Sequence, residues 1–409
     1  MRFMLTRQCP LACCIVAASL AGWAERSTET PDPDAPLHER IKTLEALILA
    51  NHWNDGLILP NVIFPPAGEE RPVTGNHEDV AAHTAFYLAA CSFEYAVMRE
   101  PAVRERARAL MDALLRLEQV TGVPGVVARG MYKTDKPLWH EKAFFFEHEW
   151  HDSTTMPGYR WEGDLSSDKF TNFFFAMSIY WELCADEAEK ARVAGFLDRF
   201  VGRCVDYNFK LVDVDGKMTL WGNFCPDLPH ENLNALEMLG GLKATYRITQ
   251  KARYEAAYRR LIDEYHYDDE AILAKVLWPD EWKTPWDDNL AAQSLYVLMR
   301  WETDRDLLIK YRMSLNRHWF DWQKQLGKRG GHVYWFPMLY QVLAGEQVVG
   351  EDVQKILRGM GGLARGKRTY VIPVDGVRRE VESEWEEASP SVLMGYWFGR
   401  HYGIIDPTW

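Results

Sequence analysis

The sequence predicts an all-α fold, an (α/α) toroid of roughly six to seven helical hairpins with minor β-hairpins. Apolar residues recur at helical spacing through most of the chain. Helix pairs return roughly every 50–60 residues without sequence identity, which is typical of a diverged ring of hairpins. No Pro- or Ser-rich linker divides the 409 residues, although one compact core seldom exceeds ~250–300 residues.

About twelve segments carry the helical pattern, each with the length of an ordinary globular helix. They are Leu37–Trp53, Glu78–Arg99, Ala102–Val120, Ser167–Cys184, Ala185–Tyr207, Glu231–Thr249, Ala252–Tyr267, Asp288–Thr303, Asp304–Gln325, Trp335–Leu343, Asp352–Met360 and Pro390–His401. In a toroid each hairpin contacts only its neighbours, so the fold escapes the size limit of a single core.

Two short β-hairpins interrupt the helices. Val212–Leu220 alternates apolar and polar residues around Asp215-Gly216, a dipeptide that favours a tight turn. A second pair of strands is predicted at Thr369–Val374 and Val377–Val381, around another Asp-Gly.

Residues 1–24 have the pattern of a secretory signal peptide. Arg2 and Arg7 precede an apolar run from Leu11 to Leu20, and small residues precede the expected cleavage after Ala24. That run is too short to span a bilayer, and no later segment is apolar for long enough. We therefore expect an exported protein, periplasmic or secreted, in which residues 25–409 form a single toroidal catalytic domain.

Charge and cysteine spacing exclude two classes of partner. The chain has 47 basic and 59 acidic residues, a net charge of −12, which argues against nucleic-acid binding. The cysteines beyond the signal peptide have no metal-binding spacing, and His148 and His151 are too close in sequence for a zincin motif. We expect no metal or cofactor, although a structural calcium ion stays open.

The most informative feature is a polar turn that leads into an apolar helix at Phe173–Trp181. Asp168 and Asn172 lie one helical turn apart, on one face, with Asp164 and Lys169 beside them. A helix that is apolar all round is buried, so these groups stand at the mouth of an interior helix. This arrangement predicts a site at one end of the bundle, whereas the structural alternative is a capped helix with an Asx turn.

Further polar clusters stand at other helix starts, and alternate helix starts of a toroid share one rim. Each could instead be a helix-dipole partner or a surface charge. Further catalytic candidates are Asn76, His77, His230, Glu231, Asp288 and Tyr296. Further substrate-binding candidates are Arg129, Tyr132, Arg160, Trp161, Glu237, Trp286, His332 and Tyr334, because arginine clamps carboxylates and aromatic rings suit the C–H faces of sugars.

Several motifs resemble a group of exported bacterial proteins with a six-hairpin, glycosidase-like toroid. The resemblance rests on Gly163–Asp168, on Leu211–Lys217 with Trp221-Gly222, on Leu233–Leu239 with Ala244–Thr249, on Trp286–Leu290 and on Leu393–Gly403, and it covers roughly residues 75–403. The sequence departs from the group at Asn172, where the group has His, and at Asn289, where it has an acidic residue.

The resemblance implies an enzyme of polysaccharide degradation that acts on an acidic oligo- or polysaccharide. Similar toroids include the glucuronan and alginate lyases of polysaccharide lyase family thirty-eight, and others are hydrolases, so one fold hosts both chemistries. Asn76 and His77 look like the Asn and His that neutralise a uronate carboxylate in such lyases.

Metal-independent β-elimination on a uronic-acid glycan is the expected reaction. It needs a group that neutralises the substrate carboxylate and a base and acid that move protons. The neutralising candidates are Asn76, His77, Asn172 and Arg129, and the proton-transfer candidates are Tyr296, His230 and Tyr334.

Two alternatives remain open at this point. An inverting glycoside hydrolase would use two carboxylates across the scissile bond. The pair would combine Asp164 or Asp168 with Glu231, Glu237 or Asp288. A non-catalytic glycan-binding protein would instead have an aromatic-lined cleft without a close acid–base pair.

Overall fold

A computed structural model describes residues 27–64, 74–75, 78–135, 150–274, 285–324, 334–374 and 377–409. The predicted signal peptide and three candidate site residues, Asn76, His77 and His332, lie outside the described residues. Export and the single catalytic domain therefore stay predictions. No helix in the described ranges is long and apolar enough to cross a membrane.

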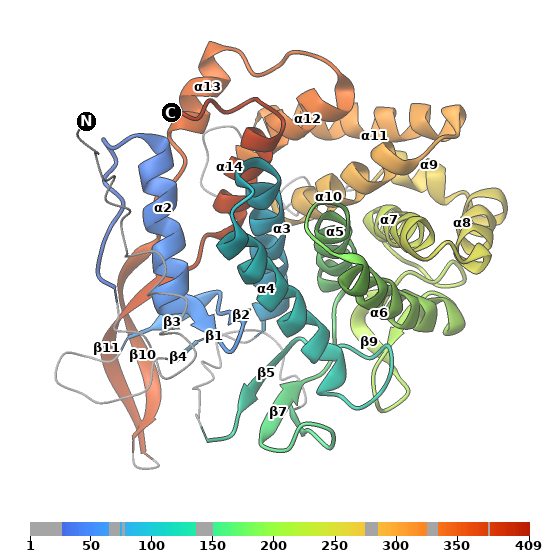
Figure 1. The fold of residues 1–409 in the computed structure, drawn as a ribbon. Coiled ribbons are helices and arrows are strands. Elements are labelled where there is room, and N and C mark those ends of the chain that lie inside the picture. Colours follow the sequence, from blue (N-terminus) through green and yellow to red (C-terminus); the bar gives the residue numbers. More distant parts are fainter. Residues whose placement is uncertain are drawn as a thin grey trace, which may run out of the picture.

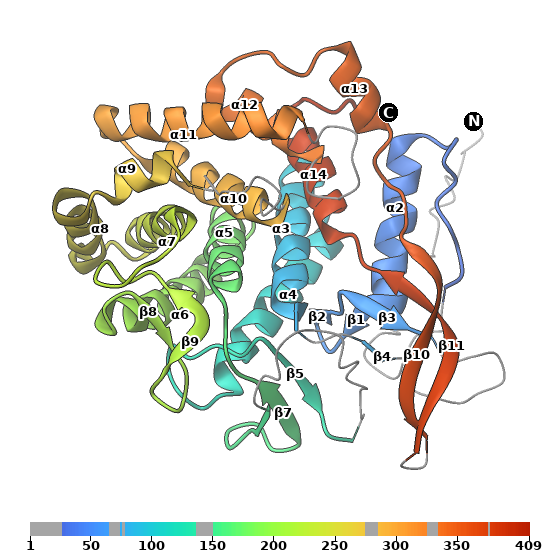
Figure 2. The same ribbon diagram turned by 180° about the vertical axis from the view of Figure 1, so that it is seen from behind.

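The helices alternate between an inner and an outer layer (Figures 1 and 2). The inner layer contains α3 (Val80–Met98), α5 (Ser167–Leu183), α7 (Asn232–Thr249), α10 (Pro285–Trp301) and α14 (Pro390–His401). Around them lie α4 (Pro101–Gln119), α6 (Glu187–Asp206), α8 (Ala252–Tyr265) and α11 (Arg305–Gln323). Shorter helices are α2 (Leu37–Leu47), which continues into the π-helical turn η1 (Ile48–His52), α9 (Tyr267–Ile272), α12 (Phe336–Ala344) and α13 (Glu351–Arg358).

The inner and outer helices differ in the pattern of their apolar residues. In α3 every residue from Val80 to Glu94 is buried, and in α5 every residue from Lys169 to Tyr180 is buried. Helices that are buried on all sides belong to the interior. The outer helix α4 buries only a stripe, from Val103 through Ala107 and Leu110 onward, because its other face meets water. The predicted all-α toroid with minor β-hairpins is confirmed.

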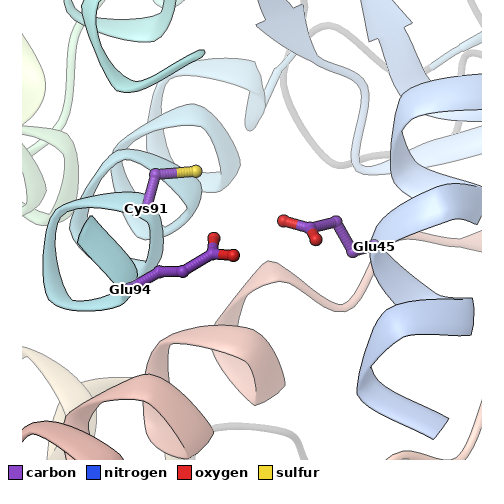
Figure 3. Close-up of side chains that lie close together, drawn as sticks. All are labelled: Glu45, Cys91 and Glu94. Carbon is purple, nitrogen blue, oxygen red and sulfur yellow. The ribbon is translucent and has the colours of Figure 1, made fainter. Parts of the chain in front are cut away.

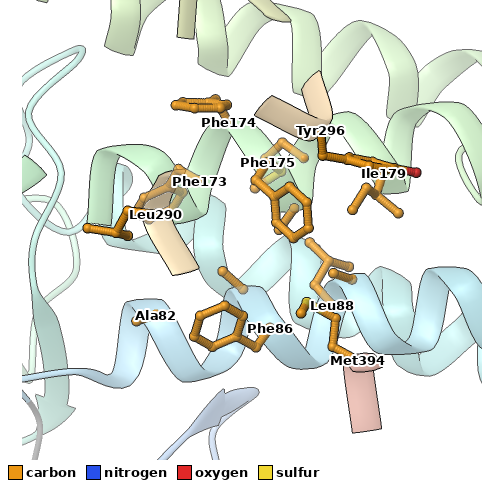
Figure 4. Close-up of a cluster of buried hydrophobic side chains, with 14 of the residues drawn as sticks. Ala82, Phe86, Leu88, Phe173, Phe174, Phe175, Ile179, Leu290, Tyr296 and Met394 are labelled. Atoms are coloured by element: carbon orange, nitrogen blue, oxygen red, sulfur yellow. The ribbon is translucent and has the colours of Figure 1, made fainter. Parts of the chain in front are cut away.

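The inner helices pack through aromatic side chains. Figure 4 shows Phe86 from α3, Phe173 and Phe175 from α5, and Tyr296 from α10 in one buried cluster. Trp335 extends the cluster, since its ring centroid lies 5.7 Å from that of Phe175. Burial of such rings contributes roughly 1.5–3 kcal/mol each, so this cluster stabilises the contacts between α3, α5 and α10.

Two consecutive glycines let α5 and α7 approach closely. A Cβ atom on Gly240 would lie 2.8 Å from Cζ of Phe174, and one on Gly241 would lie 2.6 Å from Cζ of Phe170. Glycine inside a helix costs about 0.5–1 kcal/mol relative to alanine. Glycine is needed at both positions because the phenyl rings of Phe170 and Phe174 occupy the space that a side chain would fill.

Short antiparallel sheets decorate the ring. The strands are β1 (Trp53–Asn54), β2 (Leu57–Ile58), β3 (Asn61–Ile63), β4 (Thr74–Gly75), β5 (Gly130–Lys133), β6 (Trp150–Asp152), β7 (Tyr159–Glu162), β8 (Lys210–Val212), β9 (Met218–Asn223), β10 (Arg365–Val374) and β11 (Val377–Glu387). They form the sheets β1-β2, β10-β11-β3-β4, β5-β7-β6 and β8-β9. The two predicted hairpins are β8-β9 and β10-β11, and both extend beyond their predicted limits, whereas α9 and the sheets of β1 to β7 were not predicted.

The C-terminal hairpin is tied to the N-terminal region by a buried network. Trp385 to Glu387 of β11 pair with Asn61 to Ile63 of β3. The carboxylate of Glu386 accepts hydrogen bonds from Asn51 Nδ2 (2.9 Å) and Arg365 Nε (2.7 Å) and lies 3.1 Å from His52 Nε2. The π-helical turn brings Asn51 and His52 together toward this carboxylate.

Candidate functional site

A pocket of 220 Å³ lies where α3, α5 and α10 begin. Its lining consists of Asp79, Ala82, His83, Phe86, Asp168, Asn172, Trp286, Asn289 and Leu290. The three helix starts therefore share one rim, as the sequence predicted. Asp168, Asn172 and Trp286 are the predicted site residues that the structure brings into this pocket.

A lysine joins the two carboxylates of the pocket. Lys169 Nζ lies 2.5 Å from Asp79 Oδ1 and 2.9 Å from Asp168 Oδ2. The lysine side chain is 3% exposed, whereas those of Asp79 and Asp168 are 43% and 38% exposed. The carboxylates thus face the pocket while the ammonium group stays behind them.

The N-cap side chains of both helices bind other pocket residues and do not cap their own helices. Asp79 is the N-cap of α3 and Ser166 the N-cap of α5, yet neither makes a side-chain capping bond. The Ser166 hydroxyl donates to Asp168, and Asp79 binds Lys169. Forgoing a capping bond costs ~1 kcal/mol per helix, so the site is assembled at the expense of local stability.

Electrostatics keep both carboxyl groups ionised. Burial works to raise the pKa of Asp79, but the Lys169 ammonium outweighs it and holds this pKa at about 2. For Asp168 the same balance of burial against Lys169 leaves the pKa below its usual value. The pKa of Lys169 is raised, since the attraction of the two carboxylates exceeds the effect of burial. This triad therefore carries a net charge of −1 at neutral pH.

His83 lines the same pocket as an uncharged imidazole. Burial, only partly opposed by the charge of Asp79, lowers its pKa to about 4. Its Nδ1 lies 3.2 Å from the Asp79 carbonyl oxygen, one turn earlier in α3. His83 is buried and hydrogen-bonded, and its ring also forms part of the pocket wall.

Amide groups from α5 and α10 complete the pocket lining. Asn172 Nδ2 donates to Gln293 Oε1 (3.1 Å), and the indole Nε1 of Trp335 donates to Asn289 Oδ1 (3.1 Å). Trp286, half-exposed, adds an aromatic surface at the rim. Carboxylates, amides and an indole ring are the groups that bind hydroxyl-rich ligands.

Glu237 lies buried beneath the pocket. Its Oε1 accepts a hydrogen bond from the Thr171 hydroxyl (3.0 Å), and it has no solvent exposure. Burial raises its pKa well above the ordinary value, with Asp168 adding to the effect. Glu237 supports the first turns of α5 and does not line the pocket.

The predicted arginine clamp is occupied by the protein itself. Arg129 Nη1 donates to the Asp164 carbonyl oxygen (2.8 Å) and to Ser166 Oγ (3.1 Å), and its Nη2 bonds to Glu78 (3.3 Å). The Asp164 carboxylate accepts from the backbone N–H of Leu220 (2.7 Å) in β9. Both residues fix the turn before α5 and do not line the pocket.

Three catalytic candidates lie away from the pocket lining. His230 Nε2 lies 2.9 Å from Glu270, and this partner offsets burial and raises the pKa of the histidine. Burial, with the charge of Asp287, raises the pKa of Glu231, the N-cap of α7. Asp288 is buried with its Oδ1 3.7 Å from His318 Nδ1.

Tyr296 shares a helix face with the pocket residues but lies too deep. Its hydroxyl is 2.9 Å from that of Tyr402, and its ring packs against Phe93 and Phe175. Burial raises its pKa well above the ordinary value, despite the nearby Arg300. It is a core residue and does not line the pocket.

The remaining substrate-binding candidates also lie elsewhere. Tyr132 packs on Trp150, with ring centroids 5.1 Å apart, in the sheet of β5, β6 and β7. Trp161 in β7 is buried against the ring of His151, and Arg160 pairs with Asp152. Burial raises the pKa of a further candidate, Tyr334, which is partly buried at the start of the segment leading to α12.

A second cluster resembles a metal site but is filled by an arginine. Figure 3 shows Glu45 from α2 facing Cys91 and Glu94 from α3. Arg106 Nη2 lies 2.7 Å from Glu45 and 2.9 Å from Glu94, so a cation already compensates these carboxylates. Burial raises the pKa of the Cys91 thiol, whereas metal ions bind the thiolate.

Comparison with known proteins supports the fold and nothing finer. The sequence matches no protein-family profile and no curated protein. A family 76 glycoside hydrolase from a bovine Bacteroides thetaiotaomicron strain has a similar structure, with a TM-score of 0.52 at 9% identity, over 90% of this chain and 78% of that chain. A sugar epimerase from a ruminal bacterium also has a TM-score of 0.52, at 11% identity, over 90% of this chain and 98% of that chain.

Proposed function

We propose that this protein is a carbohydrate-active enzyme that hydrolyses a glycosidic bond in the pocket of Asp79 and Asp168. The observation that carries the proposal is the pair of ionised, solvent-facing carboxylates held by one lysine. The two similar structures, a glycoside hydrolase and a sugar epimerase, support a carbohydrate substrate for a toroid of this kind.

The sign of the charge distinguishes hydrolysis from elimination. Glycoside hydrolysis passes through an oxocarbenium-like transition state, whose positive charge an adjacent carboxylate stabilises. β-Elimination instead builds negative charge on a uronate carboxylate, which Asp79 and Asp168 would oppose. The net negative triad therefore favours hydrolysis over the lyase reaction expected from the sequence resemblance.

The spacing of the carboxylates favours a retaining reaction over an inverting one. Both contact the same Lys169 Nζ atom, so their nearest oxygens cannot be farther apart than the two contacts combined. Inverting enzymes separate the groups by ~6.5–9.5 Å to admit water, whereas retaining enzymes use ~5–5.5 Å. In this proposal Asp168 is the ionised nucleophile, Asp79, which is also ionised, stabilises the positive charge of the transition state, and the leaving oxygen takes its proton from water.

A lyase is the second candidate, and one observation favours it. His83 is unprotonated at neutral pH and shares the pocket with Asn172. A neutral imidazole can accept the C5 proton while an amide binds the uronate carboxylate. The substrate of this second candidate would be the acidic glycan that the sequence resemblance implied.

One assay decides between these candidates. The purified protein is incubated with mannan, glucan, glucuronan and alginate, and both new reducing ends and the ultraviolet absorbance of unsaturated uronates are followed. We expect reducing ends without that absorbance, and a loss of at least about 10²-fold in Asp168→Asn but not in the exposed-turn control Asp215→Asn. Unsaturated products would establish the lyase, and glycan binding without either product would establish a non-catalytic glycan-binding protein.

A further inference from the structure

We propose that the pocket binds an uncharged, hydroxyl-rich sugar unit, with Asn289 as its hydrogen-bond donor and Trp335 as the residue that positions this amide. The inference rests on the proposed function, because it names the substrate class of the same site. It also differs from the acidic substrate that the sequence resemblance implied.

A hydrogen bond from Trp335 fixes the orientation of the Asn289 amide. The indole N–H of Trp335 can only donate, so it selects the carbonyl oxygen Oδ1 of Asn289 as its partner. The amide group Nδ2 then has no hydrogen-bond acceptor among the described residues, although Asn289 is fully buried and lines the pocket. Buried donors of this kind are normally satisfied, which points to an oxygen atom supplied by a ligand.

Asn172 is fixed in the opposite sense. Its Nδ2 donates to Gln293 Oε1, so its carbonyl oxygen is the group that remains for a ligand. Gln293 lies one turn after Asn289 in α10, and the two amide contacts therefore orient both pocket amides. The pocket presents one amide donor and one amide acceptor.

The two carboxylates of the pocket supply acceptors. Asp79 and Asp168 are ionised, and each carboxylate can only accept hydrogen bonds. A sugar hydroxyl donates and accepts at once, so it can serve both Asn289 and the carboxylates. A uronate carboxylate cannot donate, and the net charge of the triad repels it. The volume of 220 Å³ is below the ~300–1,000 Å³ of pockets for drug-sized ligands, which suits a single sugar unit.

Titration calorimetry with the methyl glycosides of glucose, mannose and galactose and with glucuronate tests the proposal. We expect at least one neutral glycoside to bind at least about tenfold more tightly than glucuronate. Asn289→Asp keeps the oxygen that Trp335 needs but removes the donor, and we expect it to weaken that binding at least about tenfold. Tighter binding of glucuronate, no binding of any neutral glycoside, or an unchanged Asn289→Asp would each overturn the proposal.

A pair of tryptophan variants separates positioning from packing. Trp335→Phe loses the bond to Asn289, whereas Trp322→Phe removes a buried indole whose Nε1 has no partner among the described residues. We expect only Trp335→Phe to weaken sugar binding, roughly threefold or more, and to raise KM more than it lowers kcat. Equal effects of the two variants would reduce Trp335 to a packing residue and overturn its positioning role.

These experiments distinguish failure of the sugar-binding proposal from failure of the hydrolase proposal. If neutral sugars bind through Asn289 but no glycosidic bond is cleaved, the pocket assignment stands and the hydrolase proposal fails. If hydrolysis occurs with an unchanged KM in Asn289→Asp, the hydrolase proposal stands and this inference fails.

Discussion

Replacing Lys169 with methionine tests how the site is held together. The variant keeps a long side chain but leaves the carboxylates of Asp79 and Asp168 side by side without a cation. The pKa of Asp79 falls from 3.8 to about 2 in the folded protein. This shift corresponds to about 2.5 kcal/mol, and since the Asp79 side chain is 43% exposed, solvent screening reduces the stabilisation to about 1–1.5 kcal/mol.

The pH dependence follows from the direction of that shift. A depressed carboxyl pKa stabilises the folded state above the unfolded value near 4, and this stabilisation is lost as the pH falls toward 2. We therefore expect Lys169→Met to lower the free energy of unfolding by about 1–1.5 kcal/mol at pH 7. The difference from the wild type should shrink as the pH falls from about 4 toward 2.

Urea denaturation followed by circular dichroism at several pH values measures both effects. A double-mutant cycle with Asp79→Asn isolates the coupling, which should reach about 1 kcal/mol at pH 7. A coupling near zero, or a difference between wild type and Lys169→Met that does not change with pH, would refute the assignment of Lys169 as the cation that holds the pair.

Three further predictions concern the interior. Burial, together with the charge of Glu45, raises the pKa of Glu94 to about 8, so this proton stabilises the fold below pH 4.5 and its contribution disappears as the pH rises to 8. This loss of stability is on the order of 2–4 kcal/mol, and Glu94→Gln should make stability less dependent on pH over the same range. If denaturant titrations of Glu94→Gln show the same dependence of stability on pH as the wild type, the raised pKa of Glu94 is contradicted. Gly241→Ala should cost about 1–3 kcal/mol, because its Cβ would lie 2.6 Å from Phe170, and a neutral or higher Tm would show that the rings can yield. Tyr296→Phe should lower stability by about 0.5–1.5 kcal/mol and leave turnover within twofold, whereas loss of turnover would restore its catalytic role.

Helix formation depends largely on nearby residues, so local patterns predicted the helices well. The apolar run Phe173–Trp181 indicated a buried helix, which the structure has, and a pocket lies at the start of this helix, where the polar turn predicted a site. The π-helical turn at Ile48–His52 was not predicted, because its side chains serve Glu386, which is more than three hundred residues away in the sequence.

The site was predicted only where a helix start marked it. Asp79 belonged to a polar helix start, but its partner Lys169 comes 90 residues later, so the carboxylate pair could not be recognised from spacing. His83 had no signal except its position one turn after Asp79. Tyr296 lies on the same helix face as Asn289, two turns further along α10. Helical periodicity predicts which face a residue occupies but not how far it lies from the pocket. At the level of Tyr296 the interior is filled with aromatic side chains.

The pairing of β3 with β11 has a consequence for folding. These strands lie near opposite ends of the chain, so their hydrogen bonds join segments of very high sequence separation. Contacts of such high sequence separation form slowly. The amide protons of Val62 and Glu386 should therefore gain protection late in refolding, and in the native state their hydrogen exchange should report transient opening of the ring at this seam.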